Sequence, residues 1–189
     1  TIRNKLSFGE FDCWLTFDDG LKDHILYVLP ILDKYDLKGS FYPPTITTMG
    51  QKILDVHKIQ HIISINEDSN EIIKRIKNLY EKYTNKNHLL FSELVSKIDL
   101  NSRYDDTNIV LIKRLLQRDI ELEIREKICD NLFNDIVTND KSEFIKSLYM
   151  DSNDLLKLYS LNHEIGSHGY DHFHLSYLSR SIQEQEIRK

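Results

Sequence analysis

Apolar residues follow two patterns along the chain: short runs near both ends, and long helical stripes between them. The first run, Phe11 to Phe17, leads into Asp-Asp-Gly, which predicts a buried strand that ends in a tight turn. Residues Lys22 to Tyr35 place apolar side chains at helical spacing, and Lys38 to Tyr42 predicts a second strand that stops at two prolines. The order strand, helix, strand predicts a βαβ unit and therefore a parallel sheet.

The middle of the chain has a different texture, with long amphipathic and charge-rich patterns and no convincing strand. Asp68, followed three residues later by Glu71, is typical of a helix start, and apolar stripes at helical spacing continue after it. We therefore expect a helical insertion at about residues 52–150 within a single α/β domain that spans residues 1–189.

The α/β pattern returns near the carboxyl end of the sequence. Asp151 or Ser152 is expected to cap a helix, and a short strand is expected from Glu164 to His168. Ser181 and Glu184 have the spacing of a capping box for one more helix.

Composition narrows the class of protein. The chain has 189 residues, 40% of them hydrophobic and 29% charged, as expected for a soluble globular domain. The net charge of -5, without a basic stripe, argues against a nucleic-acid partner or an anionic membrane. Cys13 and Cys129 lie far apart and indicate neither a disulfide framework nor a thiolate zinc cluster, so we expect reduced, buried thiols.

Two further features concern location. The longest apolar run, Ile25 to Leu32, contains Pro30 and falls well short of the roughly 18 residues of a membrane span, so no transmembrane segment is predicted. The sequence shows no charged and then apolar leader, but a piece of a longer protein would show none either, so the localisation stays open, with the cytoplasm slightly favoured over secretion. Nothing in the sequence predicts the oligomeric state.

Two motifs contain the candidate catalytic and metal-binding residues, and they lie at the ends of the first and the last predicted strand. The motifs are Thr16-Phe17-Asp18-Asp19-Gly20 and His168-Gly169-Tyr170-Asp171-His172. Either motif alone is weak evidence, because Asp-Asp-Gly is a common turn and a second His-x-x-x-His pair occurs in the chain. That pair, His57 and His61, lies on an amphipathic segment and is interpreted as structural or substrate-side. Together they are informative, since parallel strands end at one edge of a sheet. Two imidazoles and one carboxylate then form a metal face with open positions.

The two motifs resemble those of the polysaccharide deacetylase family, the carbohydrate esterases of family 4 that are built on the NodB homology domain. Thr16 to Gly20 is similar to the first family motif, and His163 to His172 is similar to the second with its lead-in strand. The resemblance implies an α/β fold, a distorted (β/α) barrel, here with a long helical insertion.

By this resemblance, Asp19, His168 and His172 bind a divalent metal, usually zinc, and Asp18 is the general base. The implied reaction is attack of a metal-bound water on the acetamide carbonyl of an N-acetylated sugar, in a polysaccharide or its precursor. Tyr42 and Tyr170, near predicted strand ends, are candidates to contact the saccharide substrate, whereas Trp14 is expected in the core.

The sequence also departs from the family pattern. Phe173 replaces a frequent proline, and the later arginine, Asp-Trp and Leu-x-His motifs, of which the last supplies the general acid, are not recognisable. The resemblance therefore covers a partial barrel, and we expect the carboxyl-terminal half of the barrel to be missing. Two alternatives stay open: a catalytically incomplete or non-catalytic carbohydrate-binding homologue that keeps the metal face, and an iron oxygenase with a similar ligand set.

Overall fold

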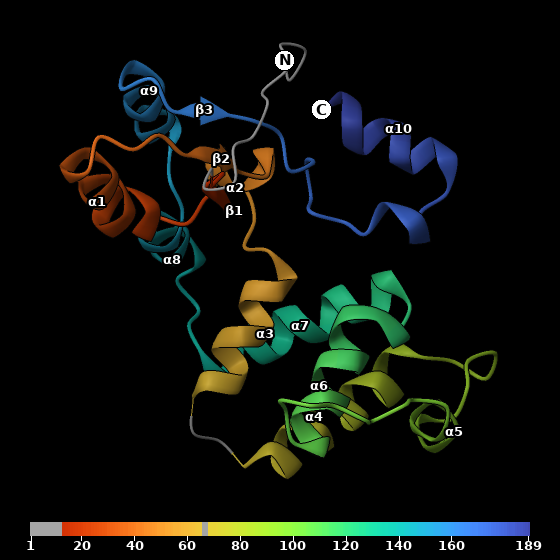
Figure 1. The fold of residues 1–189 in the computed structure, drawn as a ribbon. Coiled ribbons are helices and arrows are strands. Elements are labelled where there is room, and N and C mark those ends of the chain that lie inside the picture. Colours follow the sequence, from red (N-terminus) through yellow and green to blue (C-terminus); the bar gives the residue numbers. More distant parts are fainter. Residues whose placement is uncertain (1–12, 66–67) are drawn as a thin grey trace. The chain divides into compact units, whose positions relative to one another are not determined.

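The computed structural model describes residues 13–65 and 68–189, which form two compact units (Figure 1). The first unit contains the residues up to Lys52 and those from Ser142 onward, and the second unit is Ile53–Lys141. The described strands of the first unit make one parallel sheet with the order β1 (Thr16–Asp18), β2 (Ser40–Tyr42), β3 (Glu164–Ile165). The predicted α/β class with a parallel sheet is confirmed.

The core of the first unit lies between the sheet and two helical segments. One of these segments follows β1, and the other precedes β3. A π-helical turn, η1 (His24–Val28), continues into α1 (Leu29–Lys34), and α9 (Ser152–Ser160) leads to β3. Phe41 on β2 is fully buried, and it packs with the buried leucines of these helices. Each such buried apolar side chain stabilises the fold by about 1.5–3 kcal/mol.

The start of β1 differs from the prediction. The strand begins at Thr16, and the predicted positions Phe11 and Asp12 lie outside the described residues. Trp14, predicted in the core, is 49% exposed, and its indole N–H donates a hydrogen bond to Ser40 Oγ at 2.7 Å. An indole needs a partner for its N–H, and this position supplies one at the surface. Cys129 is buried as expected, but Cys13 is exposed.

The remaining elements of the first unit connect the strand ends. They are α2 (Thr45–Thr48), α8 (Lys141–Leu148), η3 (Leu175–Tyr177) and α10 (Arg180–Arg188). Asp151 caps α9 as predicted, accepting hydrogen bonds from the N–H groups of Asn153 and Asp154. The predicted cap at Ser181 is wrong, because Ser179 has the extended backbone of a cap and its hydroxyl accepts from the Ile182 N–H.

The second unit is helical, as the amphipathic patterns predicted. Its helices are α3 (Asp55–Ser64), α4 (Ser69–Tyr83), α5 (Phe91–Ser96), α6 (Thr107–Arg114), η2 (Leu115–Asp119) and α7 (Leu122–Ile136). Asp68 caps α4 through the Asn70 N–H. Helix α3 packs against α7, and α4 packs against both α6 and α7.

The helical unit ends before the predicted boundary near residue 150. Helix α8 has the same amphipathic character as the helices of the insertion, but almost all of it belongs to the first unit. The reason is backbone pairing at its carboxyl end, where the Lys22 N–H donates to the Leu148 carbonyl and the Met150 N–H donates to the Gly20 carbonyl, both at 2.8 Å. Among the described residues, no helix has the length and apolar character that a membrane crossing requires.

Candidate metal centre

The Asp-Asp-Gly turn after β1 has an unusual backbone, with φ of 68° at both Asp19 and Gly20. Aspartate tolerates this left-handed region better than most residues, and glycine tolerates it freely. Only glycine fits at position 20, because a Cβ there would lie 2.8 Å from the Cβ of Pro43. The Asp19 N–H donates to the Tyr42 carbonyl at 3.1 Å, so the turn is fixed against the end of β2.

The loop after β3 carries both histidines, and it too contains left-handed residues, Gly169 with φ of 79° and His172 with φ of 60°. The carbonyls of Gly169 and Tyr170 accept hydrogen bonds from the N–H groups of Thr45 and Ile46, each at 3.2 Å. These donors belong to the start of α2, directly after β2. The histidine loop is therefore held at the same sheet edge as the Asp-Asp-Gly turn.

The structure brings together the three side chains that the sequence analysis assigned to a metal. Asp19 Oδ1 lies 3.2 Å from His172 Nε2 and 3.5 Å from His168 Nε2, and the two Nε2 atoms are 3.0 Å apart. The side chains are partly exposed, by 24% for Asp19, 34% for His168 and 31% for His172. The three atoms therefore form a small triangle that solvent or a substrate can approach.

The triangle fits a divalent cation. Two ligands that are both about 2.1 Å from one ion lie roughly 3.0 Å apart at a right angle and roughly 3.4 Å apart at the tetrahedral angle. The observed separations of 3.0, 3.2 and 3.5 Å cover this range. Imidazole nitrogen and carboxylate oxygen are the donors that zinc and neighbouring transition metals accept. Among the described residues, Asp19, His168 and His172 are the group that can hold a metal ion.

Asp18, the predicted general base, ends β1 and is exposed. It lies opposite Tyr42 in the register of β1 with β2. Tyr42, a predicted substrate contact, is partly buried, and its ring covers Gly166 so closely that a Cβ there would lie 2.4 Å from it. Both residues therefore belong to the sheet edge that carries the metal face.

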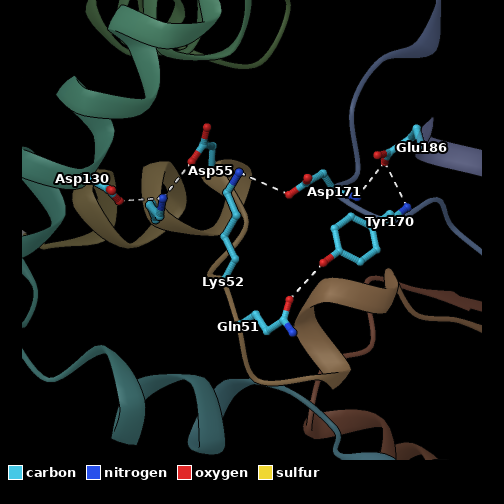
Figure 2. Close-up of polar contacts among 8 residues, drawn as sticks. Gln51, Lys52, Asp55, Asp130, Tyr170, Asp171 and Glu186 are labelled. Atoms are coloured by element: carbon cyan, nitrogen blue, oxygen red, sulfur yellow. Dashed lines mark hydrogen bonds and ion pairs between the residues drawn. The ribbon is translucent and has the colours of Figure 1, made fainter. Parts of the chain in front are cut away.

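Tyr170, the other predicted substrate contact, has other interactions in this structure. Figure 2 shows its hydroxyl donating to Gln51 Oε1 at 2.9 Å, and the ammonium of Lys189 lies 4.7 Å from the centre of its ring. Asp171, which lies between the two histidines, accepts from Lys52 Nζ at 3.3 Å and is not part of the triangle. These contacts attach the histidine loop to the segment after α2.

Sequence reasoning missed Glu186 on α10. Its Oε1 accepts from the backbone N–H groups of Tyr170 and Asp171, at 3.0 and 2.6 Å, and so contacts the loop between the two histidines (Figure 2). The sequence pattern gave no signal for it, because Glu184 lies two residues earlier in the same polar helix. Only the packing of the helix shows which of the two faces inward.

The second histidine pair, His57 and His61, lies on α3 in the helical unit. His57 is buried, and the pKa of His61 is lowered by burial and, to a smaller extent, by His57. Among the described residues, no third ligand gathers there, so this pair does not form a second candidate metal group.

Two further histidines, His24 and His163, lie in the core of the first unit. Their rings are 5.9 and 5.5 Å from the ring of Phe41, and His163 Nδ1 accepts from the Gly39 N–H at 3.1 Å. Burial lowers the pKa of both imidazoles, which for His24 outweighs the opposing effect of Asp19. Both histidines are buried in this core, and neither belongs to the metal triangle.

Comparison of the chain with protein-family models, with curated proteins and with solved structures finds no match in any of the three.

Proposed function

We propose that this chain is a metal-dependent hydrolase of the polysaccharide deacetylase type, which removes acetyl groups from N-acetylated sugars of a polysaccharide or its precursor. One observation carries the proposal: Asp19 and the histidine pair His168 and His172, far apart in the sequence, place three ligand atoms within 4.8 Å of one another. Independent turns would not converge in this way.

The roles follow from the positions of the side chains. Asp19, His168 and His172 would hold the cation, with zinc the best match to their donors. A bound cation would supply Lewis acidity, both to a water and to the acetamide carbonyl. Three protein ligands leave room for a substrate, which is the arrangement of catalytic rather than structural sites.

Asp18 would act as the general base. Its carboxylate is exposed at the end of β1, and it directly precedes the ligand Asp19, which is the place of the general base in the motif that this segment resembles. It would accept the proton that this water loses as the carbonyl is attacked, a contribution typically of 10²–10⁴-fold in rate. The acetate and the sugar amine are the two products.

Tyr42 is the better of the two tyrosines for contact with the sugar ring. It lies in register with Asp18, and a tyrosine offers a flat apolar face with a polar end. Tyr170 would contribute mainly through the loop that it anchors, because its hydroxyl is engaged with Gln51.

The sheet supports the fold that this proposal requires. Three parallel strands in the order β1-β2-β3, with helices between them, are compatible with a partial barrel of the NodB type. The helical unit Ile53–Lys141 would be an insertion between β2 and β3.

The test uses the full 189-residue chain loaded with zinc, and it measures acetate release from oligomers of N-acetylglucosamine and from an N-acetylated sugar nucleotide. Asp18→Asn should lower the rate by about 10²–10⁴-fold while bound zinc stays at one per chain. His168→Ala should abolish zinc binding and acetate release together. Asp23→Asn, which changes an exposed aspartate a few residues away, is the matched control and should have little effect.

The results separate the alternatives. A chain that binds zinc and releases no acetate from any saccharide tested would favour the non-catalytic, carbohydrate-binding alternative. Full activity of Asp18→Asn would exclude Asp18 as the base. A chain that prefers iron(II) and consumes oxygen would favour the oxygenase alternative.

A further inference from the structure

Glu186 is an unusual residue in the first unit. Among the described residues, Glu186 is the one acidic residue that is buried, with 6% exposure. It also lies in the last turn of α10, where the helix dipole disfavours negative charge. A buried carboxylate in such a place is costly unless hydrogen bonds compensate it.

The compensation comes from the histidine loop. Glu186 Oε1 accepts hydrogen bonds from the N–H groups of Tyr170 and Asp171. Both of these residues lie between the candidate ligands His168 and His172. Hydrogen bonds to an ionised acceptor are shorter and about twice as strong as neutral ones. The bond from the Asp171 N–H, at 2.6 Å, is the shorter of the two, and the bond from the Tyr170 N–H is 3.0 Å long.

The backbone of the loop is shaped for this contact. Gly169 has φ of 79°, and the N–H groups of the next two residues both donate to one oxygen, as in the concave backbone anion sites called nests. A Cβ at Gly169 would lie 2.9 Å from Glu186 Oε1, so a larger residue at this position would displace the carboxylate.

The opposite side of the loop is attached as well. The Gly169 and Tyr170 carbonyls accept from the N–H groups of Thr45 and Ile46, and the Tyr170 hydroxyl and the Asp171 carboxylate reach Gln51 and Lys52. The peptide units between the two histidines are therefore held on their carbonyl side by the start of α2 and on their N–H side by α10. Figure 2 shows the hydrogen bonds to Glu186. Only the attachment through α10 depends on a single side chain, that of Glu186.

We infer that Glu186 is a positioning residue, which fixes the loop so that His168 and His172 keep the 3.0 Å separation of their Nε2 atoms. The inference rests on the proposed metal site and specifies what holds that site in shape. Residues that orient metal ligands typically change metal affinity by 10–100-fold when they are replaced.

The experiment measures two quantities in the full chain. One is zinc affinity, by competition with a chromogenic chelator, and the other is amide hydrogen exchange at Tyr170 and Asp171 in the metal-free protein, by NMR. Glu186→Ala should weaken zinc binding by about tenfold or more and should accelerate exchange at both amides. Glu184→Ala is the matched control, because Glu184 is exposed on the same helix and pairs only locally, with Arg180.

Two conservative variants distinguish position from charge. Glu186→Gln keeps an oxygen at the same reach and loses the charge, whereas Glu186→Asp keeps the charge and withdraws the carboxylate by one methylene. A positioning role requires that Glu186→Gln retain more zinc affinity and more amide protection than Glu186→Asp. The same comparison decides the matter if Glu186→Ala does not fold.

The inference is overturned if Glu186→Ala binds zinc within about twofold of the parent chain, or if Glu186→Asp performs as well as Glu186→Gln. If the parent chain takes up no zinc, the proposed metal function fails, and amide exchange alone then decides the role of Glu186. Slow exchange at Tyr170 and Asp171 that Glu186→Ala abolishes would support it, and fast exchange in the parent would refute it.

Discussion

The two units of the molecule differ in the kind of unfavourable feature that each contains: a buried charge in the helical unit and left-handed backbone in the sheet unit. In the helical unit Ile53–Lys141, the exceptional residue is a buried cation, Lys58, which is 3% exposed. Its Nζ lies 2.8 Å from a carboxylate oxygen of Asp55, one turn away on α3, and 2.8 Å from one of Asp130 on α7. Burial alone would lower the pKa of Lys58, but the two carboxylates outweigh it and raise the pKa above its usual value. The charge is neutralised where it is buried, and it links two helices.

In the sheet unit, the exceptional feature is backbone conformation. The described non-glycine residues with positive φ are Asp19, Asp36, Asn162 and His172, all of them in this unit. Asp36 and Asn162 follow the ends of α1 and α9, where a left-handed residue is the ordinary way to finish a helix. Asp19 and His172 finish no helix, and both supply a ligand atom of the triangle.

Of these features, left-handed backbone away from a helix end is the one that indicates a functional site. A buried ion pair between helices is explained by packing, and a left-handed residue after a helix is explained by capping. Left-handed backbone without a local cause costs about 1–3 kcal/mol and tends to occur at functional sites. Among the described residues, such backbone occurs at Asp19 and His172 of the candidate metal triangle.

The largest effect is expected from a matched pair of substitutions, Asp19→Asn and Asp36→Asn. Asparagine tolerates positive φ, so neither change should strain the backbone. Asp19→Asn removes the only charged ligand of the triangle, and zinc affinity should fall by on the order of 10²-fold or more, beyond the range of residues that only orient ligands. Asp36→Asn should leave it unchanged. Isothermal titration with zinc measures both, and equal affinities in the two variants would contradict the interpretation of Asp19.

The next largest effect tests the helical unit. Lys58→Ala leaves the carboxylates of Asp55 and Asp130 without the cation between them, and the free energy of unfolding should fall by about 2 kcal/mol. This is below the 3–5 kcal/mol of a fully buried pair, because Asp130 is partly exposed and keeps Lys141. Urea unfolding measures the loss, and zinc affinity should not change.

The control for Lys58 is an exposed ion pair in the same unit. Lys77→Ala removes the pair with Glu81, whose side chains are both more than half exposed, and should cost less than about 0.5 kcal/mol. A similar loss from both variants would mean that burial of Lys58 adds nothing to the pair.

A smaller effect concerns pH and the two core histidines. Burial lowers the pKa of His24 and His163 in the folded chain. As the pH falls below the ordinary histidine pKa of 6.5, the unfolded chain therefore binds more protons at these two residues than the folded chain does. Stability is therefore complete above that pH and declines as pH falls below it. His163→Asn keeps an acceptor for the Gly39 N–H and removes one titrating group. Urea unfolding between about pH 7.5 and about pH 5.5 should show a shallower decline for this variant.

The sequence predicted that Asp19, His168 and His172 would come together because one topological rule is strong. Two motifs that each follow a strand of a parallel sheet must meet at its carboxyl edge, so Asp19 and the histidine pair could be assigned to one site without any contact information. The helical unit was predictable for a similar reason, since each of its helices carries its own apolar stripe. Local periodicity and strand order were sufficient in both cases.

What the sequence did not reveal depends on packing between distant segments. Glu184 and Glu186 look alike in the sequence, and only the docking of α10 on the loop distinguishes them. The exposure of Trp14 depends on whether Ser40, on β2, offers an acceptor for the indole. The end of the helical unit depends on the pairing of Met150 with Gly20, which the amphipathic pattern of α8 does not encode.

The smallest effect is expected from the cap of α10. Ser179→Ala removes the hydroxyl that accepts from Ile182 and should destabilise the helix by about 1 kcal/mol, whereas Ser181→Ala, inside the helix, should have almost no effect. A loss of about 1 kcal/mol raises the population of frayed helix about fivefold. Since that population starts small, zinc affinity should hardly move, but amide exchange at Tyr170 and Asp171 should accelerate by about the same fivefold. The two readouts separate, because affinity reports the dominant state and exchange reports the rare state in which Glu186 has left the loop.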